Sequence, residues 1–193
     1  MGRLRTGCPW DAEQTHLSLV RYLVEETAEA VEAIEAGDDA AMREELGDLL
    51  LEVVFQAEIG RERGAFTLAD LAAGVADKLI ARHPYVFADA PVPDDPMASW
   101  EQRKKAEKAR ASAVDGIPEP LSALARAVKT VSRARHHRVG VALPSDPIDA
   151  EAVGWQILAL AARAEASGVD ADQAVRQAVR RLEAQVRAAE AGL

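Results

Sequence analysis

Hydrophobic positions repeat with a helical period along most of the chain. Over residues 17–34, apolar residues recur at alternating steps of three and four, which is the spacing of one face of an α-helix. Gly37 follows where a left-handed residue ends many helices, and Asp38 or Asp39 can cap a second helix over about 40–61. The two segments are therefore expected to form a helical hairpin.

Turn and capping residues divide the rest of the chain into further helices. Thr67-Leu-Ala-Asp70 forms a capping box that predicts a third helix, which ends before His83-Pro84. The segment 84–96 has four prolines and no periodicity, which predicts an extended loop. Ser99-Trp-Glu-Gln102 predicts the start of a short charged helix that runs to about Ala111. Three more helices are expected at residues 121–138, 149–166 and 171–191.

Composition supports an all-α fold. Strong helix formers dominate, aromatic residues make up only 4 %, and no alternating run of β-branched residues appears. Leu19, Leu23 and Ala30 place apolar side chains beside the main stripe of the first helix of the hairpin. Because a two-helix hairpin cannot cover apolar residues on several sides, we expect a homodimer that completes a four-helix-bundle-like fold.

Length and charge exclude several classes of protein. The 193 residues carry a formal net charge of −9, which argues against nucleic acid or an acidic membrane surface as the main partner. A single cysteine excludes an intrachain disulfide framework. No apolar run approaches the ~20 residues that span a bilayer, and the first 13 residues lack the apolar run of a signal peptide. We therefore expect a soluble, cytoplasmic protein.

Four carboxylates are spaced symmetrically about Gly37. Glu29 and Glu45 lie eight residues from it on either side, and Glu26 and Asp48 lie eleven residues from it. In an antiparallel hairpin the two pairs would sit at matching heights, roughly 12 and 16 Å from the turn at ~1.5 Å per residue. Carboxylates packed so closely favour a hard cation, Mg²⁺ or alternatively Mn²⁺. The competing interpretation is a solvated acidic face.

Other residues near these helices are candidates for the same chemistry. Glu25 is either an outer ligand or simply exposed, whereas Glu32 and Glu35 fit a solvated face. Lys78 and Arg82 are four apart on the third helix, and Trp100 and Lys104 are four apart on the next. Cations beside a metal are typical of polyphosphate binding, and a tryptophan can stack on a base or sugar. The alternatives are surface charges and a core aromatic.

Several motifs in a fixed order resemble the MazG family of nucleoside triphosphate pyrophosphohydrolases. The resemblance is close over residues 1 to about 110 and looser beyond. It rests on Cys8-Pro-Trp-Asp11, Gln14-Thr-His16, the Glu-Glu-x-x-Glu and Glu-Leu-Gly-Asp motifs, Lys78 to Phe87, and Trp100 with Lys104. It implies an all-α, dimeric, Mg²⁺-dependent enzyme that cleaves a nucleoside triphosphate to a monophosphate and pyrophosphate. Clearing unwanted or excess nucleotides is the corresponding role.

The resemblance also implies roles for individual residues. The metal ligands are Glu26, Glu29, Glu45 and Asp48. The substrate-binding residues are Lys78, Arg82, Trp100 and Lys104. His16 is read separately, from its Glu-x-x-His motif, as either a structural or a substrate-facing residue. The general base is not fixed and is one of Glu25, Glu26, Glu29 and Glu45.

The sequence departs from the family pattern in two places. Where the family can place a basic residue four before the third ligand, this chain has Ala41, with Arg43 as a possible substitute. A shift of 103 positions aligns the third helix with residues 171–191, but it places a lysine at the position of Glu26. We therefore expect a catalytic domain over 1–112 and a degenerate, shortened second repeat over 113–193.

A non-catalytic helical regulator that binds nucleotides or a protein partner is the alternative function. The chain has no Gly-x-x-x-x-Gly-Lys-[Ser/Thr] motif, which excludes a P-loop NTPase. Glu13-Gln-Thr-His16 is the only Glu-x-x-His motif, whereas a di-iron bundle needs two. Measurement of pyrophosphate release distinguishes the enzyme from the regulator.

Overall fold

The structure is a computed structural model that describes residues 1–192, and all of its regular secondary structure is helical. This confirms the expected all-α class. Within that range the helices are α1 (Gly2–Gly7), α2 (Pro9–Glu13), α3 (Val20–Ala36), α4 (Asp39–Glu62), α5 (Leu68–Arg82), α6 (Pro84–Phe87), α7 (Pro96–Glu107), α8 (Ala123–His136), α9 (Ala150–Ala166) and α10 (Ala171–Glu190).

The chain forms two compact units. Unit 1 comprises residues 1–81 and unit 2 begins at Arg82. The expected division between residues 112 and 113 lies inside unit 2. That division concerns the origin and role of the second half, and it stays a prediction.

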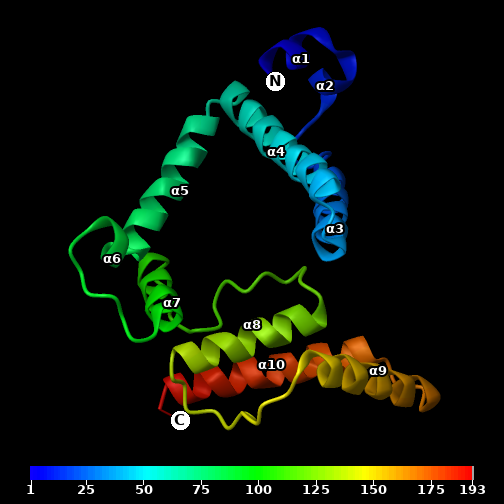
Figure 1. Ribbon diagram of the computed structural model, residues 1–193, viewed down its shortest axis with the longest axis vertical. Coiled ribbons are helices and arrows are strands. Elements are labelled where there is room, and N and C mark those ends of the chain that lie inside the picture. Colours follow the sequence, from blue (N-terminus) through cyan, green and yellow to red (C-terminus); the bar gives the residue numbers. More distant parts are fainter. Residues whose placement is uncertain (193) are drawn as a thin grey trace. The chain divides into compact units, whose positions relative to one another are not determined.

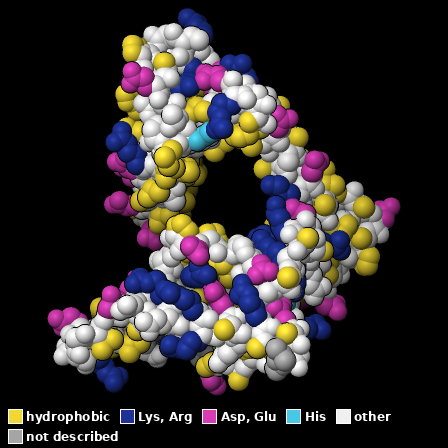
Figure 2. Space-filling view, turned by 180° about the vertical axis from the view of Figure 1, so that it is seen from behind, with side chains coloured by type: hydrophobic (Ala, Val, Ile, Leu, Met, Phe, Trp, Pro, Cys, Tyr) yellow, Lys and Arg dark blue, Asp and Glu magenta, His cyan; other side chains and the backbone are white. Residues whose placement is uncertain are grey.

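Unit 1 is built around the predicted helical hairpin. Helix α3 packs along α4, with the two lying side by side in Figure 1. Leu19, Phe55 and Ile59 form a small buried cluster at the end away from the connecting turn. Many other apolar side chains of the hairpin stay exposed, and Figure 2 shows hydrophobic side chains on its surface. They are Val20, Leu23, Val24, Val31 and Ile34 on α3 and Leu46, Leu50, Leu51 and Val53 on α4.

Two short N-terminal helices were not predicted. Helix α1 is attached to the end of α4 by the guanidinium of Arg5, which donates to the carboxylate of Glu62 at 2.6 and 3.0 Å. The same guanidinium lies over the Phe55 ring, 5.8 Å from its centroid. Because α1 and α2 are too short for a hydrophobic period to show, the sequence pattern carries little sign of them.

Unit 2 has its own core between α8 and α10, which lie side by side in Figure 1. Ala113, Val114, Ile117, Ala134 and Val186 are buried there. Helix α9 contributes no buried residue to this core.

Two local expectations in unit 2 were wrong. The segment after His83 is not wholly extended, because Pro84 begins the one-turn helix α6, where its missing N–H leaves no hydrogen bond unmade. Helix α7 begins at Pro96, not near Ser99. Its cap is Asp95, whose carboxylate accepts from the Ala98 N–H at 2.9 Å.

None of the helices within residues 1–192 combines the length and the hydropathy needed to cross a bilayer.

Candidate functional site

The turn between α3 and α4 fixes how the two helices face each other. Gly37 has φ 67°, a conformation that a side chain disfavours. The N–H groups of Gly37 and Asp38 close the end of α3 by donating to the carbonyls of Ile34 and Ala33, each at 3.2 Å. The Asp38 carboxylate then accepts from the first N–H groups of α4, those of Ala40 and Ala41. The expected left-handed glycine is thus confirmed, and Asp38 is the cap.

This turn brings three of the four predicted ligands together. Glu26 and Glu29 on α3 and Glu45 on α4 each offer a carboxylate oxygen, and these oxygens lie within 4.8 Å of one another. We call these three residues the carboxylate cluster. Asp48 is outside this group, although its charge acts on Glu26 and Glu45. The matched heights deduced from the sequence therefore correspond to real proximity for three side chains.

Burial and neighbouring carboxylates raise the pKa of Glu26 and of Glu45. Loss of solvent contact raises the pKa of Glu26, and the charges of Glu29, Asp48, Glu45 and Glu25 raise it further. For Glu45, loss of solvent contact again comes first, followed by the charges of Glu29, Glu44 and Asp48. Bringing these groups together as anions therefore costs free energy, which a bound cation would offset.

The donor set fits a hard divalent ion. Oxygen ligands lie about 2.1 Å from Mg²⁺, so neighbouring ligand oxygens lie roughly 3 Å apart and opposite ones roughly 4 Å apart. Three oxygens within 4.8 Å of one another need only small side-chain movements to reach that arrangement. All of them belong to carboxylates, which Mg²⁺ and Mn²⁺ prefer to nitrogen or sulfur.

A cavity of about 360 Å³ adjoins the cluster near the turn. Glu29 and Glu45 line it, together with Ala41, where the family pattern allows a basic residue. Arg43 is exposed and is not among the residues that line this cavity. The wall at position 41 therefore presents a methyl group and no positive charge.

Glu52 is a buried carboxylate that the sequence analysis missed. It lies on α4 four residues after Asp48 and seven after Glu45, a spacing that keeps it on the same side of the helix. Its side chain is 7 % exposed, one carboxylate oxygen has no hydrogen-bond partner among the described residues, and burial raises its pKa. An acid among Leu51, Val53 and Val54 was visible in the sequence, but its burial was not.

His16 is held by side chains of unit 1. Its Nδ1 is hydrogen-bonded to the side-chain oxygen of Gln56, and its ring stacks on Phe66 with centroids 5.9 Å apart. Gln56 follows Glu52 by one helical turn on α4. These contacts are those of a positioned side chain, and a role toward substrate stays a prediction.

The two predicted cations of α5 have different surroundings. Lys78 is exposed. Arg82 is only 7 % exposed, donates two hydrogen bonds to the Glu107 carboxylate at 2.7 and 2.9 Å, and lies over the Trp100 ring at 4.8 Å. The structure thus places Arg82 in an internal ion pair, and its phosphate-binding role stays a prediction.

Trp100 and Lys104 belong to unit 2, where they face different neighbours. The Trp100 ring packs against the His83 ring at 5.0 Å and lies under Arg82. The Lys104 ammonium lies 3.9 Å from a Glu101 carboxylate oxygen and lines a separate cavity. Although Trp100 and Lys104 are four residues apart on α7, their side chains therefore contact different neighbours and do not form one surface.

Comparison with known families identifies the domain that contains the carboxylate cluster. Residues 14–87 match the MazG nucleotide pyrophosphohydrolase domain, and this range contains the whole carboxylate cluster together with Asp48, Lys78 and Arg82. A 26.1 kDa Streptomyces cacaoi protein described as uncharacterized is 45 % identical over 98 % of this chain and 79 % of its own length. The chain belongs to the MazG family. The family is one of hydrolases, and the resemblance drawn from the motifs is confirmed.

Relatives in this family include proteins named for the activity. The Escherichia coli (strain K12) nucleoside triphosphate pyrophosphohydrolase is 47 % identical over 69 % of this chain and 54 % of its own length. The Mycobacterium tuberculosis nucleoside triphosphate pyrophosphohydrolase is 40 % identical over 93 % of this chain and 52 % of its own length. This MazG chain therefore spans about half the length of these named enzymes.

Proposed function

We propose that this chain is a metal-dependent nucleoside triphosphate pyrophosphohydrolase. It converts a nucleoside triphosphate to a nucleoside monophosphate and pyrophosphate and so removes unwanted or excess nucleotides in the cytoplasm. The observation that carries the proposal is the convergence of Glu26, Glu29 and Glu45 from two helices onto one point. Membership of the MazG family and the names of the relatives support it.

The proposed tasks of the carboxylates are metal binding and proton acceptance. Glu26, Glu29, Glu45 and Asp48 hold Mg²⁺, for which Mn²⁺ is the alternative. A bound divalent ion supplies charge stabilisation on the phosphate oxygens and acidifies water. One carboxylate among Glu25 and the three cluster residues accepts the proton of the attacking water.

The basic and aromatic residues would bind the nucleotide. Lys78 and Lys104 are the proposed contacts of the triphosphate, and His16 is held beside α4 by Gln56. Arg82 and Trp100 are proposed to bind the nucleotide as a packed pair, in which the guanidinium lies over the indole ring.

Hydrolysis assays with purified full-length protein test this function. We expect Mg²⁺-dependent release of pyrophosphate and nucleoside monophosphate in equal amounts from a panel of nucleoside triphosphates. Glu45→Ala or Asp48→Ala should lower turnover at least ~100-fold, the scale on which electrostatic catalytic groups act. Glu35→Gln, an exposed acid of α3 outside the cluster, is the matched control and should leave turnover unchanged. Binding of nucleotide without turnover would instead identify a non-catalytic regulator.

The proposed assembly is a homodimer. The exposed apolar residues of α3 and α4 cover much of the hairpin, and two such hairpins packed together would form a four-helix bundle. Light scattering should give twice the chain mass, and Leu50→Arg, a charge at a 60 % exposed leucine, should shift the mass to that of a monomer. A monomeric wild-type protein would contradict the assembly.

A further inference from the structure

Four basic side chains line one cavity of unit 2, which we call the basic pocket. Lys104 comes from α7, Arg110 from the segment after it, and Lys129 and Arg133 from α8. The cavity measures about 410 Å³. Its remaining lining residues are Gly116, Pro118, Leu121 and Ala125. A pocket of this size admits a small polyanion.

The cations of the basic pocket are poorly neutralised. Glu101 is the one carboxylate of residues 1–192 within ion-pair distance of any of them, at 3.9 Å from the Lys104 ammonium and 3.8 Å from Arg133 Nε. Neither Arg110 nor Lys129 has an ion-pair partner in that range. The nearby Asp115 carboxylate instead accepts from Arg187 at 2.9 Å. In that range, four cations therefore have one carboxylate within ion-pair distance.

Arg133 brings an unused donor to this pocket. It is 2 % exposed, and its Nη1 is anchored by the backbone carbonyls of Ala113 and Asp115 at 3.2 and 2.7 Å. Its Nε has no hydrogen-bond partner among the described residues, and neither has Oε2 of Glu101. These two atoms lie 3.8 Å apart, so Arg133 and Glu101 form a buried ion pair that is too long for a hydrogen bond and leaves both atoms unsatisfied.

Like charges act on one another across the pocket. Burial lowers the pKa of the Lys104 ammonium, and the charges of Lys129, Arg133 and Arg110 lower it further, against the opposite effect of Glu101. Burial also lowers the pKa of Arg133 and Arg110 adds to this effect, while the charges of Glu101 and Asp115 oppose it. The free energy of the pocket would fall if an anion entered it.

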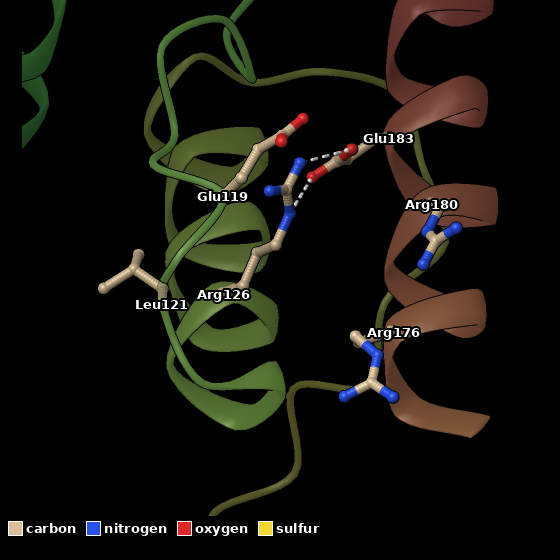
Figure 3. A pocket seen from close by; sticks show the side chains of 6 residues that line it. All are labelled: Glu119, Leu121, Arg126, Arg176, Arg180 and Glu183. Carbon is tan, nitrogen blue, oxygen red and sulfur yellow. Dashed lines mark hydrogen bonds and ion pairs between the residues drawn. The ribbon is translucent and has the colours of Figure 1, made fainter. Parts of the chain in front are cut away.

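A neighbouring cavity of unit 2 provides the contrast. It measures about 490 Å³ and also contains three arginines, but Arg126 is bonded through two nitrogens to Glu183 across the gap between α8 and α10 (Figure 3). Glu119 lies close by and favours the charged Arg126, while Arg176 is paired with Asp172. Two of the three arginines there each have a carboxylate of their own, whereas Lys104 and Arg133 of the basic pocket share Glu101.

We propose that the basic pocket binds a polyphosphate group. Several phosphate oxygens carrying multiple negative charges can accept from Arg110 and Lys129 at once, while the buried charge of Arg133 adds to the attraction. The chemistry is shared by the tail of a nucleoside triphosphate and by inorganic polyphosphate. The inference goes beyond the proposed function, which uses only Lys104 of this set, and it rests on unit 2 alone.

Calorimetric titration of the full-length protein with inorganic tripolyphosphate tests the proposal. The titration contains EDTA, so that no metal ion at the carboxylate cluster can recruit the ligand. We expect binding by the wild type that Lys129→Gln and Arg110→Gln each weaken about tenfold, the value of one charge-assisted hydrogen bond. Both side chains are only partly buried, so neither change opens a cavity in the core.

Arg180→Gln is the matched control, since it removes one positive charge from the neighbouring cavity. It should change the dissociation constant by no more than about twofold. Equal weakening by Arg180→Gln and Lys129→Gln would mean a general effect of net charge and would overturn the proposal, as would a wild type that does not bind. In the absence of ligand, Lys129→Gln should raise the midpoint of thermal unfolding, because it relieves repulsion between like charges. A lowered midpoint would contradict the crowding of positive charge in the basic pocket.

A second titration, with a non-hydrolysable nucleoside triphosphate, distinguishes the two sources of the ligand. If the pocket takes a nucleotide tail, the analogue binds and Lys129→Gln weakens it; if it takes inorganic polyphosphate, only tripolyphosphate responds to Lys129→Gln. Both outcomes support a polyphosphate site. Tripolyphosphate binding without any nucleotide hydrolysis would refute the proposed function but support the polyphosphate site. Nucleotide hydrolysis without tripolyphosphate binding in EDTA would support the proposed function but refute the polyphosphate site.

Discussion

The two units concentrate charge of opposite sign. In unit 1, Glu26, Glu29 and Glu45 bring carboxylate oxygens within 4.8 Å of one another. In unit 2, four cations line a pocket with Glu101 as their one carboxylate within ion-pair distance in residues 1–192. Each cluster raises the free energy of the unit that contains it, and each would be relieved by a ligand of opposite charge.

The clusters differ in how the chain assembles them. The carboxylate cluster needs one turn, because the helices on either side of Gly37 carry all its members and place Glu29 and Glu45 at equal distances from the turn. The basic pocket needs α7, the segment after it and α8, whose relative placement depends on packing across unit 2. Local geometry thus produces one site and tertiary packing the other.

The largest effect expected from this contrast is the stabilisation of the folded protein by magnesium. Magnesium at about one hundred times its dissociation constant should stabilise the folded protein by about 2.7 kcal/mol, and Glu29→Gln should abolish most of that gain. Lys129→Gln should leave the magnesium effect intact, because it changes only the basic pocket. Differential scanning calorimetry with and without MgCl₂ measures the shift. Equal loss in both variants would show that the clusters do not act separately.

The same contrast explains how much could be predicted. Gly37 and Asp38 predict the turn, and counting outward from it places Glu29 opposite Glu45 with no further information. Asp48 was expected in the same group, but the residues whose oxygens converge are the other three. Helix periodicity gives the height of a side chain along the axis more reliably than the position of its carboxylate at the end of a flexible stem.

Burial was the information that the sequence lacked. Glu52 stands in an apolar run without any pattern that shows it to be 7 % exposed. Arg82 was expected to bind phosphate, yet it lies in an ion pair with Glu107, a residue 25 positions away. Neither the burial of Glu52 nor the Arg82–Glu107 ion pair follows from the spacing of residues along one helix, because both depend on packing between different segments.

Glu52 offers the next largest effect, through the dependence of stability on pH. Burial raises its pKa in the folded state, so its protonated form favours folding below the pKa of the unfolded chain, and this stability is lost as pH rises through the folded pKa. Glu52→Gln is neutral throughout, so its advantage over the wild type should grow from about zero at acidic pH to roughly 1–3 kcal/mol at alkaline pH.

Urea denaturation between pH 4 and pH 9 measures this difference. Glu44→Gln, an exposed acid on the same helix, serves as the control and should show no such growth. A constant offset between Glu52→Gln and the wild type at every pH would mean that Glu52 does not change its protonation state on folding.

The smallest expected effect concerns the turns that lead into the two clusters. Gly37 precedes α4, and Ala109 directly precedes Arg110 of the basic pocket; both have positive φ, 67° and 47°. The same bonding closes both helix ends, with N–H groups of Ala109 and Arg110 donating to carbonyls of α7 at 3.1 Å. Because only glycine adopts this conformation freely, Gly37→Ala should destabilise unit 1 by about 1 kcal/mol, and Ala109→Gly should stabilise unit 2 by about 0.5–1 kcal/mol. Calorimetric unfolding of the two variants measures the change in the free energy of unfolding, which should be opposite in sign for the two. A destabilising Ala109→Gly would show that the backbone at Ala109 is not strained.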